Sequence, residues 1–147
     1  MSFQSATFRK PEIRELGIQA LDDENQAILD HLQTLVDLLT DRAAPNRCAL
    51  VLRNFDQLET SMKAHFEHEQ DIVESAGYAD WERHAAAHRT LTQAVLMLRH
   101  RFEQEPQDSH TKDMAQFLCD WWISHVNHVD TDYVSCMNCP VTVRSAM

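Results

Sequence analysis

Apolar residues recur every three to four positions along four stretches of the chain, and polar residues fill the positions between them. This period is that of an α-helix with one buried face. The pattern predicts four helices, over about 22–42, 46–75, 81–102 and 110–134. Asp22 is the predicted N-cap of the first helix, since it is followed by further acidic residues in the first turn. Short connections between four amphipathic helices favour an all-α, up-down-up-down four-helix bundle.

The chain has 147 residues, a length that is typical of one domain with a sizeable core. It contains only two Gly and four Pro, which favours a few long helices over many strands and turns. We expect an N-terminal arm at 1–17, the bundle at 18–134 and a short C-terminal tail at 135–147.

The net charge of −10 argues against nucleic acid or an anionic membrane surface as a partner. No apolar run approaches the roughly 20 residues that span a bilayer, and the first residues do not resemble a secretory signal. We therefore expect a cytoplasmic protein whose four Cys are not a disulfide framework.

The tail carries Cys136-x2-Cys139 just after the last predicted helix, where the helix dipole disfavours a thiolate. Free thiols are the simpler interpretation, and a disulfide formed under oxidation or a contact with a protein partner is the alternative. Cys48 and Cys119 are predicted to be small buried residues.

Candidate metal ligands occur in pairs on three of the predicted helices. The pairs are His65-x3-Glu69, His84-x3-His88 and His125-x4-Asp130. Residues four apart share one helix face, and imidazole together with carboxylate suits a borderline metal such as iron. A single His on an apolar face is more often a core residue. Four inward His and two inward carboxylates favour a metal site inside the bundle, because buried carboxylates need a counter-charge.

Aromatic residues surround these pairs on the last helix. Phe117 and Trp121 are predicted to point inward, whereas Trp122 is expected to be partly exposed. His68 and His128 each lie three positions after a candidate ligand, and we expect them at the edge of the site or in solvent.

The order and spacing of these residues resemble the hemerythrin family, and bacteriohemerythrins in particular. The resemblance covers about 16–133 and rests on Leu16-Gly17-Ile18, Leu21-Asp22, His65-Phe66-x2-Glu69, Tyr78, His84-x3-His88 and Trp121-x3-His125-x4-Asp130-x2-Tyr133. It implies a bundle that holds two non-haem iron ions bridged by carboxylates.

By this resemblance, one iron has three imidazole ligands, the second iron has His65, and Glu69 and Asp130 bridge the two. The three imidazoles are those of His84, His88 and His125. His125 and Asp130 are five positions apart, about 140° around an ideal helix, so their pairing rests on the resemblance and not on spacing.

The first helix departs from the family pattern. The family has Ile-Asp-x-Gln-His there, with the His as a ligand of the second iron, and this chain has Leu21-Asp22-Asp23-Glu24-Asn25. An amide oxygen is a weaker donor than imidazole and suits harder cations. Asp22 or Glu24 is a possible substitute ligand. The second iron then has an open position, is loosely held, or serves reduction or sensing.

Three interpretations of function follow. The favoured one is a protein that binds dioxygen, nitric oxide or peroxide for storage, delivery or sensing. The alternative is a di-iron enzyme that reduces or activates such a ligand at the iron left open by Asn25. A bundle with one metal or none, kept for structure or interaction, is the third interpretation.

Overall fold

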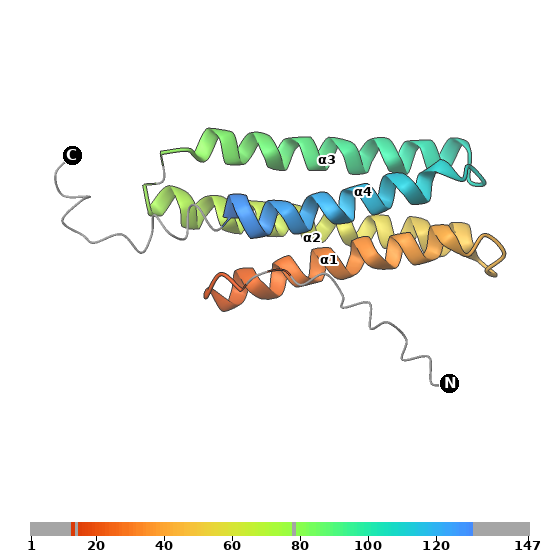
Figure 1. Ribbon diagram of the computed structural model, residues 1–147, viewed down its shortest axis with the longest axis horizontal. Coiled ribbons are helices and arrows are strands. Elements are labelled where there is room, and N and C mark those ends of the chain that lie inside the picture. Colours follow the sequence, from red (N-terminus) through yellow and green to blue (C-terminus); the bar gives the residue numbers. More distant parts are fainter. Residues whose placement is uncertain (1–12, 14, 78, 131–147) are drawn as a thin grey trace, which may run out of the picture.

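The protein folds into four long helices that run in alternating directions, as the computed structural model in Figure 1 shows. The structure describes residues 13, 15–77 and 79–130, and side chains as far as residue 128. The helices are α1 (Gln19–Thr40), α2 (Arg47–Ser75), α3 (Trp81–Gln104) and α4 (His110–Ser124), and α4 continues into a π-helix, η1 (His125–Asp130). The predicted four-helix bundle is confirmed.

The interior of the bundle has an apolar part and a polar part. Leu, Ile, Val and Phe side chains from all four helices fill the part nearest the α1–α2 and α3–α4 loops, among them Leu32, Leu35, Leu39, Val51, Phe55, Val95, Leu98 and Phe102. The buried polar residues Asn25, His65, Glu69 and His84 lie nearer the start of α1 and the α2–α3 connection. The candidate ligands therefore occupy one end of the core.

The start of α1 differs from its prediction. The helix begins at Gln19, three residues before Asp22, so Asp22 is not the N-cap. Its carboxylate accepts hydrogen bonds from the backbone N–H groups of Leu16, at 2.6 Å, and Gly17, at 3.2 Å. Gly17 has φ +85°, a conformation that suits glycine. Asp22 thus stabilises the turn that leads into α1.

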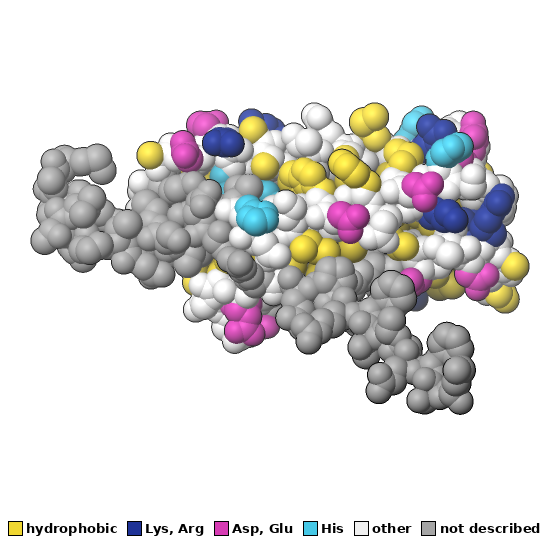
Figure 2. Space-filling view, in the orientation of Figure 1, with side chains coloured by type: hydrophobic (Ala, Val, Ile, Leu, Met, Phe, Trp, Pro, Cys, Tyr) yellow, Lys and Arg dark blue, Asp and Glu magenta, His cyan; other side chains and the backbone are white. Residues whose placement is uncertain are grey.

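Burial on α4 also differs from its prediction. Phe117 is 66% exposed and Trp122 is fully buried, the reverse of what was expected. Trp122 continues the buried row of Ala115 and Leu118 at helical spacing, and Phe117 lies 100° away from Leu118. Cys119 is buried as predicted, but Cys48 is exposed near the start of α2. Figure 2 shows hydrophobic side chains along the middle of the face that α3 and α4 form.

Arg47 joins the end of α1 to the α3–α4 loop. Its buried guanidinium donates hydrogen bonds to the carbonyls of Leu38 (3.1 Å), Leu39 (3.1 Å) and Pro106 (2.6 Å). Carbonyls in the last turn of a helix have no hydrogen-bond partner within the helix. A buried cation that donates to them removes the free-energy cost of burying these carbonyls unpaired.

The division into arm, bundle and tail stays a prediction, because 1–12, 14 and 131–147 lie outside the described residues, as do Cys136 and Cys139. Among the helices that are described, none is long and apolar enough to cross a membrane.

Candidate metal centre

Four candidate ligands from three helices converge at one point of the core. Glu69 on α2, His84 and His88 on α3, and His125 at the start of η1 each offer a donor atom, and these atoms all lie within 4.8 Å of one another. All four residues are buried. The i,i+4 spacing within α3 places both of its imidazoles on the interior face, as predicted.

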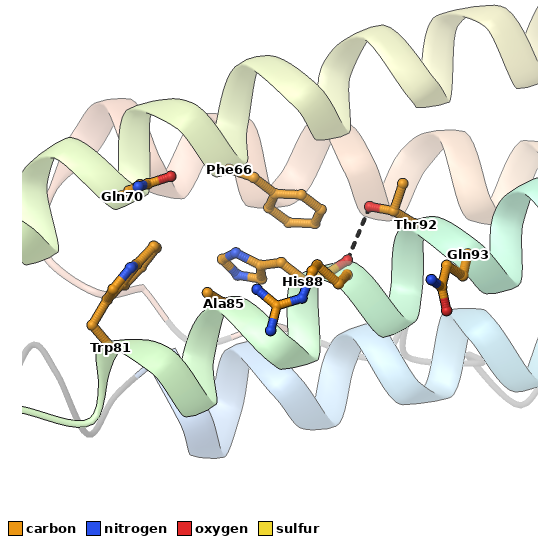
Figure 3. Close-up of a pocket in the computed structure, with 8 residues that line it drawn as sticks. Phe66, Gln70, Trp81, Ala85, His88, Thr92 and Gln93 are labelled. Carbon is orange, nitrogen blue, oxygen red and sulfur yellow. Dashed lines mark hydrogen bonds between the residues drawn. The ribbon is translucent and has the colours of Figure 1, made fainter.

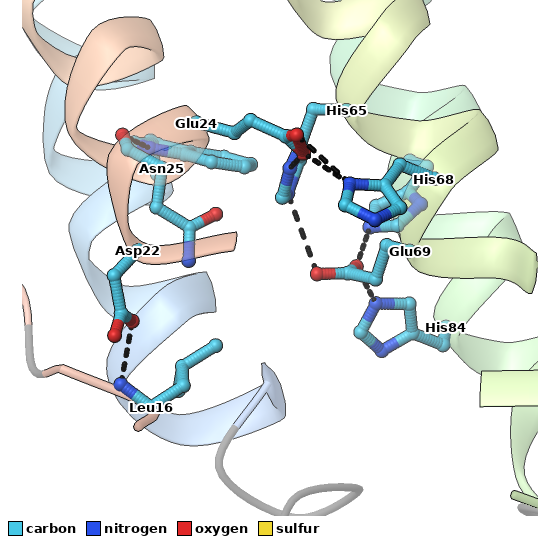
Figure 4. A network of polar contacts seen from close by, with 10 residues as sticks. Leu16, Asp22, Glu24, Asn25, His65, His68, Glu69 and His84 are labelled. Atoms are coloured by element: carbon cyan, nitrogen blue, oxygen red, sulfur yellow. Dashed lines mark hydrogen bonds and ion pairs between the residues drawn. The ribbon is translucent and has the colours of Figure 1, made fainter. Parts of the chain in front are cut away.

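Glu69 lies at the centre of this cluster, with an imidazole on each side. Its Oε1 is 2.5 Å from Nε2 of His84 and 3.0 Å from Nε2 of His88. Its Oε2 is 3.3 Å from Nε2 of His65, the residue one turn earlier on α2. Figure 4 shows this carboxylate between His65 and His84. A carboxylate placed in this way can offer one oxygen to a metal ion beside His84 and His88, and the other oxygen to a metal ion beside His65.

Burial and charge keep the donors in their ligating forms. Burial alone raises the pKa of Glu69, but hydrogen bonds from His65, His84 and His88 hold it well below its usual range. Burial lowers the pKa of His88 to about 4, although the negative charge of Glu69 acts to raise it. Burial and electrostatic repulsion from His84 lower the pKa of His125 to about 4. A neutral imidazole has a nitrogen lone pair for a metal, and an ionised carboxylate provides negative charge.

Each of the three clustered imidazoles packs against an aromatic ring. Phe66 stacks on His88 with centroids 3.9 Å apart, Trp81 on His84 at 5.7 Å, and Trp121 on His125 at 5.0 Å. Trp122 lies 5.5 Å from His125 on another side. These contacts fix the ring orientations and limit water around the donors.

Trp81 was not among the residues predicted from the sequence to border the site. Its spacing was the available signal, because it precedes His84 by three positions and His88 by seven, and so shares their helix face.

Glu24 binds the outer side of His65. Its carboxylate is 2.9 Å from Nδ1 of His65 and 2.9 Å from Nδ1 of His68 (Figure 4). Glu24 is 30% exposed and His68 is 41% exposed, so this pair lies at the edge of the core. A carboxylate on the far nitrogen fixes the tautomer and orientation of a ligating imidazole. Asp22, the other predicted substitute, instead binds the turn before α1.

Asn25 is fully buried on the face of α1 that looks into the core. Neither atom of its side-chain amide has a hydrogen-bond partner among the described residues. Its backbone carbonyl accepts a hydrogen bond from Nε1 of Trp122 at 3.1 Å, which ties α1 to α4 at this level.

The end of the fourth helix changes its winding at the candidate ligand His125. Residues His125–Asp130 form a π-helix, whose hydrogen bonds join residues five apart. Backbone positions 125 and 130 therefore lie about one turn apart, which an α-helix would not allow. The side chain of Asp130 is outside the described part, so its predicted bridging role stays a prediction.

A groove between α2 and α3 reaches the outer side of the cluster. It has a volume of about 370 Å³, and its lining includes His88, Phe66, Trp81 and Gln70. Figure 3 shows Phe66 lying over the imidazole of His88, and Thr92 bonded to the His88 carbonyl. Phe66 and the candidate ligand His88 therefore both line the groove.

Comparison with known proteins agrees with this geometry. The hemerythrin HHE cation binding domain matches residues 16–136, which is most of the chain. The chain belongs to the hemerythrin family. It is 28% identical over 117 residues to the bacteriohemerythrin of Methylococcus capsulatus, which covers 80% of this chain and 86% of that protein. It is 25% identical over 118 residues to the bacteriohemerythrin of Pseudomonas paraeruginosa, covering 80% and 73% respectively. No solved structure gave a significant match.

The residues present suit the non-haem metal site that membership of this family implies. Three imidazoles and one carboxylate converge in the buried core, and this donor set is typical of iron and its neighbours among the transition metals. The His/Glu cluster, the family match and the bundle fold thus agree on a hemerythrin-type protein with a metal-binding core.

Proposed function

We propose that this protein holds two non-haem iron ions and binds dioxygen, or a related ligand such as nitric oxide or peroxide, for storage, delivery or sensing. The observation that carries the proposal is Glu69, a fully buried carboxylate with imidazoles facing both of its oxygens. A buried anion needs a counter-charge, and two cations that share this carboxylate would supply it.

In this proposal, His84, His88 and His125 hold one ion and His65 holds the other. Glu69 bridges the two, and Asp130 is the proposed second bridge. Support comes from the grouping of the donor atoms of Glu69 and the three imidazoles within 4.8 Å, and from the position of His65 opposite Oε2. Iron in such a site would supply reversible electron transfer to a small ligand.

The chain's own residues would control what reaches the ions. Phe66, Trp81 and Trp121 cover the outer faces of the imidazoles and exclude water. Exclusion of water limits protonation of a bound ligand and so favours its release unchanged. Glu24 holds His65 with Nε2 directed inward.

A di-iron enzyme that reduces or activates the same ligands is the second candidate. The observation in its favour is Asn25, a weak neutral donor and not an imidazole, whose buried amide projects from α1 towards His65 and Glu69 (Figure 4). A position with fewer strong ligands is more open to substrate and to protons.

The deciding experiment measures iron per chain and the optical spectrum of the reduced protein before and after dioxygen. Binding predicts a spectrum that reverses when dioxygen is removed, and an enzyme predicts continued consumption of dioxygen with an added electron donor. His84→Ala should abolish iron loading, whereas His68→Ala, a change to a half-exposed residue at the edge of the core, should not. Iron loading that survives His84→Ala would refute the proposed ligand set.

A further inference from the structure

The two sides of the Glu69 carboxylate have unequal surroundings. Oε1 faces Nε2 of His84 and of His88, and a donor atom of His125 lies in the same group. Oε2 lies 3.3 Å from Nε2 of His65 on α2. The two α3 imidazoles therefore contact Oε1, and His65 on α2 contacts Oε2.

The hydrogen bond to Glu24 fixes what His65 can offer. A neutral imidazole has one N–H, and the carboxylate of Glu24, 2.9 Å from Nδ1, favours the tautomer in which Nδ1 carries it. In that tautomer the hydrogen bond from His65 to Glu69 is absent, and the Nε2 lone pair points towards Oε2 of Glu69. Two acceptors this close repel each other unless a cation or a proton lies between them, so the geometry suits a cation shared by His65 and Glu69.

Asn25 is the α1 residue that faces this second side. Its side-chain amide is fully buried, and neither amide atom has a hydrogen-bond partner among residues 15–77 and 79–128. Buried amides are nearly always paired, so one without a partner needs an explanation. Figure 4 shows the amide projecting from α1 into the space between α1 and α2, towards Glu69 and His65.

We propose that the Asn25 side-chain oxygen, His65 Nε2 and Glu69 Oε2 form a second cation position that binds its ion more weakly than the three-imidazole position. Amide and carboxylate oxygens outnumber nitrogen there, a balance that suits harder divalent cations such as Mn(II) relative to iron. The second position therefore exchanges its iron for Mn(II) while the first keeps its iron. This inference rests on the proposed function for the identity of the first ion.

The test is equilibrium dialysis of the iron-loaded protein, without dioxygen, against a large excess of Mn(II). Metal analysis should find that iron falls from about two to about one per chain as Mn(II) rises to about one. Asn25→His supplies an imidazole from the same position of α1, so this variant should keep both irons. The exchange ratio should change by roughly tenfold or more, as expected when a buried donor to a charged group is gained or lost.

Asn54→Ala is the matched control. Asn54 is another buried Asn, on α2, whose amide donates to the backbone carbonyl of His31 away from the cluster. This variant should exchange iron for Mn(II) as the unaltered protein does. Wild-type protein that keeps both irons, or an Asn25→His variant that loses one equally fast, would overturn the inference. Failure of the wild-type protein to load any iron would instead overturn the proposed function.

A second variant tests the premise without any metal. Asn25→Leu keeps the branched shape of the side chain in a larger, fully apolar form, so it should raise the midpoint of thermal unfolding of the metal-free protein, because an unpaired amide no longer has to be buried. A lower midpoint in this variant would show that the amide has a structural partner, and the second cation position would lose its support.

Discussion

The contact between Glu24 and His65 predicts that a change at Glu24 will alter metal affinity, although Glu24 is not one of the four residues whose donor atoms cluster around Glu69. Glu24→Ala removes the carboxylate that lies 2.9 Å from Nδ1 of His65. The imidazole can then rotate or take its other tautomer, with Nε2 protonated and unable to ligate. We expect the ion held by His65 to bind more weakly, and the ion held by the three imidazoles to bind as before.

The size of the effect follows from the exposure of Glu24. Partners on the outer nitrogen of a ligating imidazole contribute about 10–100-fold to metal affinity. Glu24 is 30% exposed and shares its charge with His68, so the lower end of this range applies, about tenfold or roughly 1.4 kcal/mol. The free energy of unfolding of the metal-free protein should fall by less than about 1 kcal/mol, because the pair is partly solvated.

A competition titration against a chelator measures this affinity, with thermal unfolding as the parallel readout. Asp23→Ala is the matched control, since Asp23 is the neighbouring carboxylate and contacts only exposed Gln19 among the described side chains. Glu24→Gln keeps an acceptor and should lose less affinity than Glu24→Ala. Unchanged affinity in Glu24→Ala, together with lost affinity in His65→Ala, would refute the orienting role.

Three further predictions concern stability. Arg47→Met should lower the free energy of unfolding by about 3 kcal/mol or more, because it removes buried hydrogen bonds to three backbone carbonyls. Arg42→Met, a change to an exposed residue, should lower it by about 0.5 kcal/mol, and equal effects of the two variants in urea titrations would contradict this prediction. Removal of metal should lower the unfolding midpoint, and adding iron back at 100 times its Kd should restore about 2.7 kcal/mol in calorimetry. The backbone N–H of His110 and the guanidinium of Arg101 lower the pKa of Asp108 to about 2, so its stabilising effect should be complete above about pH 4 and lost as pH falls towards 2. The gap in unfolding midpoint between wild type and Asp108→Asn should close over that range, and a gap that persists at pH 2 would argue against the ionised contact.

The periodic pattern predicted the fold well because helix faces are decided by many residues at once. Four apolar stripes gave four helices, and the ends at residues 47, 75, 81 and 110 lie within a residue of their predictions. The start of α1 was missed because Asp22 has the chemistry of an N-cap but uses it on the preceding turn. A capping residue binds whichever backbone N–H groups are free nearby, and sequence alone does not show which these are.

Single-residue burial was harder to predict than helix position. Phe117 and Trp122 are both large aromatic residues on α4, and either could serve as an inward anchor at the level of a bundle core. The backbone hydrogen bond that Trp122 donates to Asn25 on α1 decides between them, and this contact joins residues 97 positions apart. Such a pairing depends on the relative rotation of two helices, which the pattern of one helix does not specify.

The sequence predicted which residues form the polar cluster better than it predicted their arrangement, because i,i+4 spacing fixes which side chains share a helix face. It pointed to Glu69, His84 and His88, while His125 followed from the apolar face of its helix and from the family resemblance; one donor atom of each of the four lies within 4.8 Å of the others. It could not relate His125 to position 130, because that relation depends on a change to π-helical winding. Widening the turn inserts one extra residue per turn and opens the backbone. This change of winding lies where the core is polar, near Asn25, whose buried amide has no hydrogen-bond partner in the part of the chain that the structure describes. Burying the polar side chains of Asn25, Glu69 and His125 at this end of the bundle lowers the stability of the metal-free fold. Burial of the apolar side chains in the rest of the bundle offsets that loss.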